Sequence, residues 1–282
     1  MTDSLSPPYY LLSVDLEDIR SQTPAGEGMD FRVPAMVDRF LRFFDDHKIE
    51  CTFFVEGETV EHIGGLIREA HEAGHEIACH THDHTPLDKL TPVGFRENLE
   101  RNIEALDRQG VGSVAGFRAP DFSLIESTRW AWDVLIELGF RYSSSVLPAK
   151  NPLYGWAGFS LSPVRLDNGL WELPISVASL GGFKVPFAGG VYLRFFPKPV
   201  LRRFSRRFAG QRQPLVGYFH PYDIDAEEER FRVEDNILFN WLVFYNRAST
   251  LPKLALLLEN FTAIRFLDYV RVLEQMEGGS SG

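Results

Sequence analysis

Histidines are concentrated in one stretch of this 282-residue chain. Residues 75–84, HEIACHTHDH, contain four of the eight histidines. His80 and His84 are four residues apart, so both imidazoles converge on one point if the segment curls as a helical turn. Imidazole is a good zinc ligand, and a catalytic zinc site combines three protein ligands with a water. The spacing predicts a metal site, with a solvated polar loop as the alternative; we expect His82 to point away and His75 to lie on the surface.

The third metal ligand is expected among the acidic residues that end the first predicted strand. The segment SVDLED supplies Asp15, Glu17 and Asp18 directly after an apolar run. Barrel enzymes keep their active sites at the carboxyl ends of strands. Side chains alternate along a strand, so Asp15 and Glu17 should point to the same side. We expect one carboxylate to bind metal and another to take a proton from the bound water, and a solvated turn is the alternative.

Arg118 and His220 each follow another strand-like run, in GFRAPDF and VGYFHPYD. An arginine can hold a carboxylate with two parallel hydrogen bonds. A single histidine such as His220 is more often structural than catalytic. In a parallel α/β fold, however, the strand ends that carry Asp15, His80, Arg118 and His220 share one rim. The sequence therefore predicts that these four residues form one site.

Alternating strands and helices must position these residues. Apolar residues recur at helical spacing over 32–49, residues 51–57 read as a buried strand, and Thr91 and Pro92 begin a helix. Strands alternate with helices from residue 9 to about 145, which predicts parallel strands with crossover helices. Turn signals and alternation over 155–182 predict a β-hairpin insertion. Residues 251–275 read as helix, strand and helix, which would close the sheet.

The sequence shows no internal repeat and no low-complexity linker, which favours one domain over residues 1–276, with 277–282 as a flexible tail. No run of 18 apolar residues occurs, and the N-terminus has no visible secretory pattern, so we expect a cytoplasmic location. The formal charge of −10 makes nucleic acid a poor candidate for a partner. Cys51 and Cys79 lie in apolar runs and are expected to be buried.

Residues 194–212 are basic despite the overall negative charge. The segment interleaves cations with aromatic residues, namely Arg194, Lys198, Arg202, Arg203, Arg206, Arg207 and Arg212 with Phe195, Phe196, Phe204 and Phe208. A short helix of this composition suits the surface of an anionic membrane, at the inner face for a cytoplasmic protein. The alternative is a surface helix whose phenylalanines pack on the core.

These motifs resemble, in type and order, those of the polysaccharide deacetylase family (NodB homology, carbohydrate esterase family four). GHEIACHTHDHTPLDKLT is similar to the family's H-[ST]-x-x-H motif, and SVDLED resembles its first motif, T-F-D-D. GFRAPDFS and YFHP are similar to the third and last motifs. The segments RYSSSVLP, LWELPIS and GGVYLRFFP resemble the branch linked to exopolysaccharide export and exosortase loci. The resemblance implies a distorted (β/α)7 barrel.

The resemblance also implies roles. His80 and His84 would bind a divalent metal, zinc first, although cobalt, nickel or iron suit the same ligands. Asp15 would be the general base, Arg118 would orient it, and His220 would be the general acid. The reaction implied is removal of the N-acetyl group from an amino sugar in a glycan or lipid-linked saccharide, with release of acetate.

The chain departs from the family pattern at two places. The metal-binding aspartate should follow the base, but Leu16 stands there. In family branches with D-x-D, the metal ligand lies two residues after the base, and that position is Glu17 here. Asp18 is the other candidate for the metal ligand. The period of two along the strand favours Glu17. The acidic residue that tunes the acid histidine is also not evident, because Ser143 stands where relatives often have aspartate. The candidates for binding substrate or for tuning the acid histidine are Pro120, Trp171 and Glu172. For Glu172, the alternative is a carboxylate on the surface of a hairpin.

Two other functions stay open at this point. Hydrolysis of a cyclic amide, as in allantoinase-like relatives, is one, but those relatives tend to lose the paired histidines that this chain keeps. A non-catalytic glycan-binding protein on the same fold is the other. Loss of the base or the acid would signal it, and Asp15 and His220 are both present.

Overall fold

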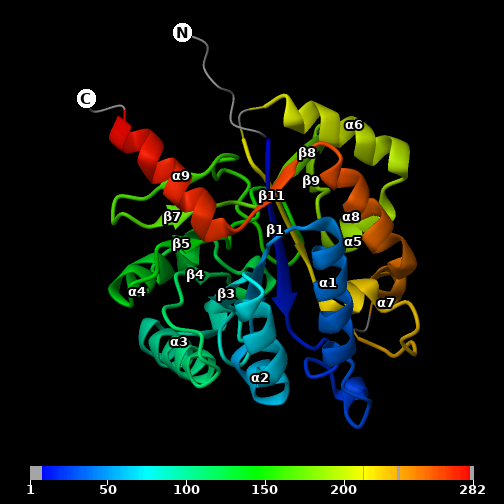
Figure 1. Ribbon diagram of the computed structural model, residues 1–282, viewed down its shortest axis with the longest axis horizontal. Helices are drawn as coiled ribbons and strands as arrows, with labels where there is room; N and C mark the ends of the chain where they lie inside the picture. Colours follow the sequence, from blue (N-terminus) through cyan, green and yellow to red (C-terminus); the bar gives the residue numbers. More distant parts are fainter. Residues whose placement is uncertain (1–7, 212, 234–235, 280–282) are drawn as a thin grey trace.

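A parallel β-sheet organises the chain in the computed structural model, which describes residues 8–211, 213–233 and 236–279 (Figure 1). The nine-stranded sheet has the order β10-β1-β2-β3-β4-β5-β7-β6, and β11 also pairs with β1. All neighbours pair in parallel except β6 and β7. The strands are β1 (Tyr9–Leu16), β2 (Thr52–Val55), β3 (Glu76–Cys79), β4 (Gly116–Phe117), β5 (Tyr142–Ser143), β6 (Val164–Arg165), β7 (Trp171–Glu172), β10 (Leu215–Phe219) and β11 (Thr262–Ile264).

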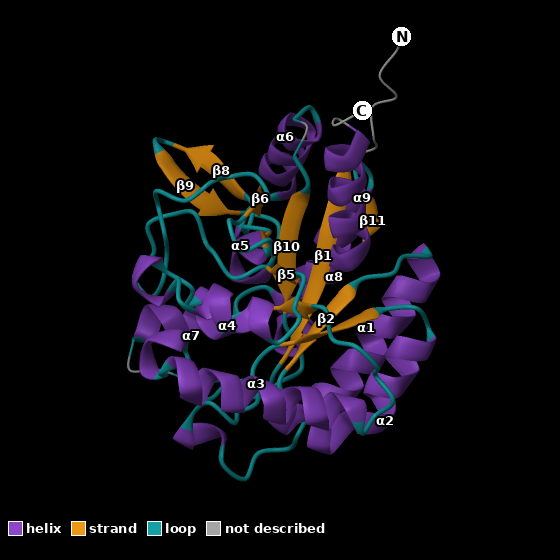
Figure 2. Cartoon of the chain, turned by 90° about the vertical axis from the view of Figure 1, so that its left-hand side faces the viewer, coloured by secondary structure: helices purple, strands orange, loops and turns teal. Residues whose placement is uncertain are grey.

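Helices cover the sheet (Figure 2). Local sequence explains their ends: the Thr91 side chain accepts from the Gly94 amide at 3.2 Å at the start of α3, and Lys48 in the left-handed region ends α1. The helices are α1 (Val33–His47), α2 (Gly57–Glu72), α3 (Pro92–Asp107), α4 (Ala131–Glu137), α5 (Gly190–Phe195), α6 (Lys198–Ala209), α7 (Ile237–Phe244), α8 (Thr250–Leu258) and α9 (Phe266–Gly279).

The alternation of side chains along β1 separates the main core from the site. Tyr10, Leu12, Val14 and Leu16 belong to the main core, which also contains the α1 phenylalanines. The intervening positions point to the opposite face of the sheet, where Leu11 packs in a second core with residues of α9. Asp15 and Glu17 continue this second set. The strand period thus places both carboxylates on one side, as predicted.

The predicted α/β fold with a distorted barrel is confirmed, and so is the hairpin signal after residue 155. The sheet curls and runs from β10 at one edge to β6 at the other, so the barrel is open. Two hairpins are present: β6 with β7 at the sheet edge, and a separate pair of β8 (Val177–Leu180) with β9 (Phe183–Pro186). Helix α9 continues through Gly279, so residues 277–279 of the predicted flexible tail are helical, and 280–282 lie outside the described residues.

Helix α6 forms as predicted, but its aromatic residues do not face solvent. Phe204 and Phe208 are buried in the main core with Phe196, whereas Phe195 is 54% exposed. Arg194 is also buried, and Arg212 lies outside the described residues. The exposed side of α6 carries Pro199 and five cations: Lys198, Arg202, Arg203, Arg206 and Arg207. Figures 1 and 2 both place α6 at the end of the molecule away from the arrowhead of β1.

Helix α7 was not expected from the sequence, and it exposes several apolar side chains, Ile237, Leu238 and Trp241 among them. No helix in the described ranges is both long enough and apolar enough to cross a membrane. The buried, unpaired state expected for Cys51 and Cys79 is observed.

Candidate active site

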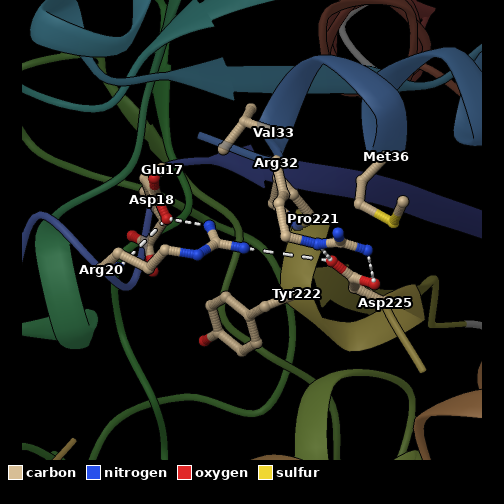
Figure 3. A pocket seen from close by; sticks show the side chains of 9 residues that line it. All are labelled: Glu17, Asp18, Arg20, Arg32, Val33, Met36, Pro221, Tyr222 and Asp225. Atoms are coloured by element: carbon tan, nitrogen blue, oxygen red, sulfur yellow. Dashed lines mark hydrogen bonds and ion pairs between the residues drawn. The ribbon is translucent and has the colours of Figure 1, made fainter. Parts of the chain in front are cut away.

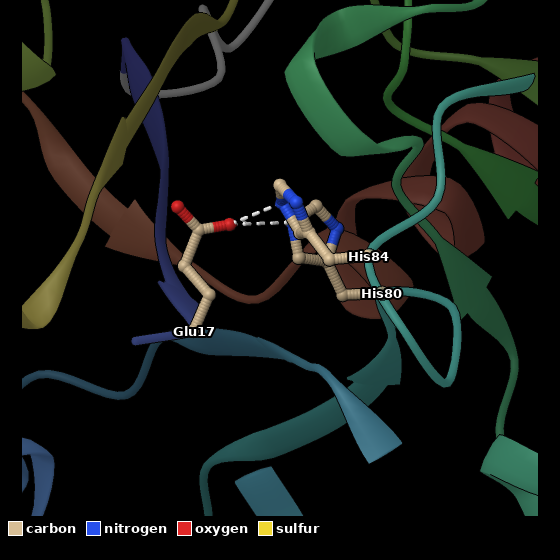
Figure 4. Close-up of side chains that lie close together, drawn as sticks. All are labelled: Glu17, His80 and His84. Carbon is tan, nitrogen blue, oxygen red and sulfur yellow. Dashed lines mark hydrogen bonds and ion pairs between the residues drawn. The ribbon is translucent and has the colours of Figure 1, made fainter. Parts of the chain in front are cut away.

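Glu17, His80 and His84 come together at the carboxyl ends of β1 and β3 (Figure 4). One ligand atom from each lies within 4.8 Å of the other two, and all three residues are buried. Glu17 Oε2 is 3.3 Å from His80 Nε2 and 2.5 Å from His84 Nε2. His80 Nδ1 contacts the Arg118 carbonyl oxygen at 2.9 Å. A proton on Nδ1 therefore leaves Nε2 of His80 available as a ligand.

A strained loop presents the two histidines. Thr81 and His84 have φ of 62° and 55°, values that non-glycine residues rarely adopt. Two asparagines of α3 hold this loop. The Asn102 amide donates to the carbonyls of Val55 and Thr81 at 2.8 and 2.5 Å, and Asn98 accepts from the His82 amide at 2.5 Å. Asn98 and Asn102 were missed from the sequence; their signal was two amides on the core-facing side of a helix.

The other two histidines of the motif do not enter the site. His82 is buried against the backbone of Gly57, where an added Cβ would lie 2.2 Å from its Nδ1. The prediction that His75 lies on the surface is wrong. His75 is buried: its Nδ1 accepts from the Cys51 amide at 3.1 Å, and its ring packs edge-on against Phe53. The start of β3 therefore lies inside the protein, although its first residues are polar.

Arg118 is fully buried and pairs with Asp15. Its Nη1 donates to Asp15 Oδ1 and to the Ser13 hydroxyl, both at 2.6 Å, and its Nε donates to the Ser144 carbonyl at 2.9 Å. The guanidinium lies 4.0 Å from the centre of the Phe54 ring. The predicted orienting contact between Arg118 and Asp15 is therefore present in the structure. The planar guanidinium of Arg118 has partners on three sides, and these contacts hold the Asp15 carboxylate in place.

His220 has a carboxylate partner that the sequence interpretation missed. Asp223 Oδ2 accepts from the His220 amide at 2.9 Å and lies 3.0 Å from its Nδ1. Arg194 Nη2 lies 2.9 Å from the other oxygen of Asp223 and is held by the Val243 and Tyr245 carbonyls at 2.7 and 3.0 Å. Nε2 of His220 faces Glu17 Oε1 at 3.8 Å. The H-x-x-D spacing of His220 and Asp223 was the sequence signal from which this pair could have been predicted.

Asp18 points away from the histidines. Its Oδ1 lies 2.6 Å from Arg20 Nη1, as Figure 3 shows. Arg20 also pairs with buried Glu228, and Asp225 binds Arg32 through two contacts of 2.5 and 2.8 Å. Glu17, and not Asp18, therefore stands with the paired histidines, while Asp18 belongs to the neighbouring ion-pair network.

All three predicted substrate-binding residues are buried instead. Trp171 packs in the second core. Glu172 is inaccessible: its carboxylate accepts from the Ser145 and Val146 amides at 2.8 and 3.0 Å. Hairpin β6–β7 joins the sheet edge rather than projecting into solvent, so neither side chain reaches His220 or solvent. Pro120 begins the buried turn after Arg118, beside the site but enclosed.

Charge is coupled across the site. Burial alone would raise the pKa of Glu17, but His84, His80 and His220 together hold it well below its usual range. Burial would lower the pKa of His84, yet Glu17 outweighs it and raises that pKa to about 9. The pKa of His220 is also raised, because Asp223 and Glu17 outweigh its burial.

Two further carboxyls beside this group were not expected. Burial raises the pKa of Glu56, which follows β2, to about 7. Exposed Asp121 follows Pro120 with φ of 54°, and partial desolvation raises its pKa against the opposing effect of His84.

Known proteins resemble this chain in sequence over part of its length and in fold. A family model described as polysaccharide deacetylase matches residues 26–143, and a model for a domain of unknown function matches residues 144–271. The first match covers less than half of the chain, and it shows that residues 26–143 resemble the polysaccharide deacetylase family. His80, His84 and Arg118 lie in the first match, Asp15 and Glu17 precede it, and His220 lies in the second. The nine-stranded sheet contains strands from both matched segments.

Individual relatives are distant. A peptidoglycan-N-acetylglucosamine deacetylase of Bacillus cereus is 26% identical over 107 residues, which are 38% of this chain and 37% of that protein. The chain spans less than half the length of the curated relatives it matches. A candidate polysaccharide deacetylase from Mycobacterium smegmatis has a similar structure, with a TM-score of 0.62, 18% identity, and coverage of 98% of this chain and 94% of that one. A pseudoenzyme of carbohydrate esterase family four from Bacillus anthracis gives 0.52 at 11% identity, with coverage of 94% and 66%.

The Glu17–His84 pair should make the stability of the metal-free protein depend on pH. The pKa of His84 is raised to about 9 from about 6.5, so the pair contributes fully below about pH 6.5 and loses its contribution as pH rises to about 9. The lowered pKa of Glu17 preserves the pair down to acid pH. In urea unfolding, the free energy of unfolding should be lower at about pH 9.5 than at about pH 6.5, by on the order of 3 kcal/mol. His84→Gln should lack this difference. Equal pH dependence in both proteins would contradict the coupling.

Proposed function

We propose that the protein is a metal-dependent hydrolase that removes the N-acetyl group from an amino sugar in a glycan or lipid-linked saccharide and releases acetate. The single observation that supports this most is the convergence of three groups on one rim. These are the ligand set Glu17, His80 and His84, the buried pair of Asp15 with Arg118, and His220 with its carboxylate partner. Amide hydrolysis needs an activated water, a base and an acid, and each has a residue here.

The donor chemistry fits a divalent metal. Two imidazoles and one carboxylate are ligands that zinc accepts, and three protein ligands leave a position open for catalysis. Among the described residues, Nε2 of His84 is buried without a hydrogen-bond partner of good geometry, although Glu17 lies near it. When bound, such a metal lowers the pKa of a water and polarises a carbonyl group. Zinc is our first choice, and cobalt, nickel or iron would suit the same ligands.

Asp15 is suited to the role of general base. Its carboxylate is 2% exposed and Arg118 fixes Oδ1, so the side chain does not have to reorganise when it accepts a proton. In this proposal Asp15 takes a proton from the water that attacks the amide carbonyl. Arg118 keeps its charge and its contacts throughout, which makes it a positioning residue.

His220 is suited to the role of general acid. Asp223 accepts from Nδ1–H, which orients the ring so that Nε2 faces the ligand group. In this proposal Nε2–H donates its proton to the nitrogen of the amide as the C–N bond breaks, because an amine leaves poorly as an anion. The products are acetate and the free amino sugar. The presence of both base and acid supports a catalyst over the non-catalytic and cyclic-amide alternatives, although a pseudoenzyme shares the fold.

Removing the acid should separate catalysis from metal binding. We expect His220→Ala to lower acetate release from N-acetylated glycans by roughly a hundredfold or more while metal content stays at the wild-type level. Asp223→Asn should lower turnover less, because the ring remains but loses its charged partner. Asp268→Asn, a change of the same kind on the surface ion pair with Arg265, is the matched control. Wild-type turnover in His220→Ala would refute the assigned role.

We also propose a cytoplasmic protein that contacts the inner face of an anionic membrane, as the basic segment suggested. The burial of three phenylalanines and Arg194 leaves the exposed cations of α6 and Phe195 for this contact, and the four arginines Arg202, Arg203, Arg206 and Arg207 provide most of the charge. Each is worth roughly 1 kcal/mol near an anionic surface. Changing all four arginines to glutamine should abolish sedimentation with anionic vesicles at low salt, and neutral vesicles are the control. Unchanged sedimentation of the variant would contradict the contact.

A further inference from the structure

Residues 173–222 carry charge of one sign only. They contain no aspartate or glutamate, although the chain has 39 acidic residues and a formal charge of −10. The stretch includes the β8–β9 hairpin as well as α6, and the hairpin takes no part in the proposed chemistry. A segment without acidic groups attracts anions, so the hairpin and α6 suit the same kind of partner. Its eight basic residues are Lys184, Arg194, Lys198, Arg202, Arg203, Arg206, Arg207 and Arg212.

The β8–β9 hairpin stands apart from the main sheet and ends in a tight turn. Its strands form a separate two-stranded sheet in which Leu180 lies opposite Phe183. Gly181 and Gly182 connect them with φ of 56° and 86°, and the two-residue type I′ turn requires positive φ at both positions. A Cβ added to either glycine would meet no atom within 4 Å. The turn therefore projects away from the rest of the protein.

Apolar side chains occupy the tip of this hairpin, residues 180–183. Leu180 is 47% exposed and Phe183 is 74% exposed. Side chains alternate along a strand, so these two lie on the same face as Ala178 and Val185, which pack against the main core. The apolar face of the hairpin thus begins on the core and continues into solvent at the tip. Lys184 is exposed directly after Phe183.

The base of the hairpin packs against α6. Phe187 follows β9, and its ring centroid lies 5.5 Å from that of Phe204 and 5.6 Å from that of Phe208. The next carbonyl, of Ala188, accepts from the Tyr10 hydroxyl at 2.6 Å. Figures 1 and 2 both place the hairpin at the same end of the molecule as α6, away from the arrowhead of β1. The apolar tip and the cations of α6 are therefore presented together.

The five exposed cations of α6 are available to an anionic partner. None of them forms an ion pair with another residue that the structure describes. A soluble polyanion would pair with these cations but would leave Leu180 and Phe183 in water. An anionic bilayer suits both features, because phosphate groups lie at its surface and hydrocarbon lies below them. The cations and the apolar tip together therefore favour a bilayer.

We propose that Leu180 and Phe183 insert into an anionic membrane while the cations of α6 bind its phosphate groups. This inference rests on the proposed contact of α6 with the membrane, and it adds an apolar anchor that buried Phe204 and Phe208 do not provide. Stable attachment to a membrane generally takes two signals, such as an apolar group and a polybasic patch. Attachment by this end leaves the rim that carries His220 facing away from the lipid, so a saccharide reaches it from the aqueous side.

A fluorophore on an introduced cysteine tests insertion directly. Cys51 and Cys79 are buried, so nitrobenzoxadiazole can be attached selectively to Phe183→Cys. With vesicles of phosphatidylglycerol and phosphatidylcholine at low salt, we expect its emission to shift to the blue and to be quenched by lipids that carry a nitroxide on the acyl chain. Ile237→Cys is the matched control: this apolar position on α7 is 86% exposed, and its label should not respond.

Replacing the tip should remove the apolar part of the contact. We expect Leu180→Ser combined with Phe183→Ser to weaken binding to these vesicles by about tenfold, since less apolar surface enters the lipid. The remaining binding should disappear with added salt, because it depends on the charges of α6. Ile237→Ser should bind like wild type. Both tip side chains are exposed, so the double variant should keep the wild-type thermal melt and the wild-type acetate release from a soluble N-acetylated glycan.

The outcomes separate this inference from the other proposals. Insertion of the tip is overturned if wild type sediments with the vesicles while the label at residue 183 does not respond, if the label at residue 237 responds equally, or if the double variant keeps wild-type affinity. The contact of α6 survives those results. If wild type does not sediment, both membrane proposals fail. A responding label at residue 183 supports the anchor even if no soluble glycan yields acetate, a result that would refute only the proposed hydrolase.

Discussion

The buried guanidinium of Arg118 is the contact on which the site depends. Arg118 directly follows β4. Its guanidinium donates to Asp15 at the end of β1 and to the carbonyl of Ser144 after β5, and it lies against Phe54 of β2. The carbonyl of the same residue contacts Nδ1 of His80 after β3. A buried charge is tolerated only with such complete pairing, so removing one partner typically costs about 3–5 kcal/mol. Arg118 thereby holds Asp15, the proposed base, and His80, a proposed metal ligand, and contacts residues at or near the ends of five strands.

The rest of the site comes from the half of the chain that matches a domain of unknown function. That segment supplies β10 with His220, the partner Asp223, and Arg194 from α5, which is bound to the carbonyls of Val243 and Tyr245 around α7. Because β10 pairs with β1 directly, His220 and Glu17 are neighbours although some 200 residues separate them. The boundary between the two matched segments therefore does not divide the site, and the second segment completes it.

Residues that directly follow parallel strands could be assigned from the sequence, because strand ends share a rim whatever the detailed packing. Asp15, His80, Arg118 and His220 were found this way, and the period of two along β1 separated Glu17 from Asp18. Hydrogen-bond partners that short turns or distant segments bring to the site could not be predicted in this way. Asp223 depends on a turn after β10, and Arg194 on the packing of α5. Glu172 was misassigned because a hairpin at a sheet edge and one in solvent have the same alternating pattern.

We propose that Glu17, His80 and His84 bind one metal ion opposite His220. Metal analysis after zinc loading and removal of free ion, on wild type, Glu17→Ala, His84→Ala and Asp18→Asn, measures this binding. We expect about one equivalent in wild type and in Asp18→Asn, and loss of the ion in the other two, since three protein ligands make a catalytic zinc site. Full retention in Glu17→Ala, or no ion in wild type, would contradict it.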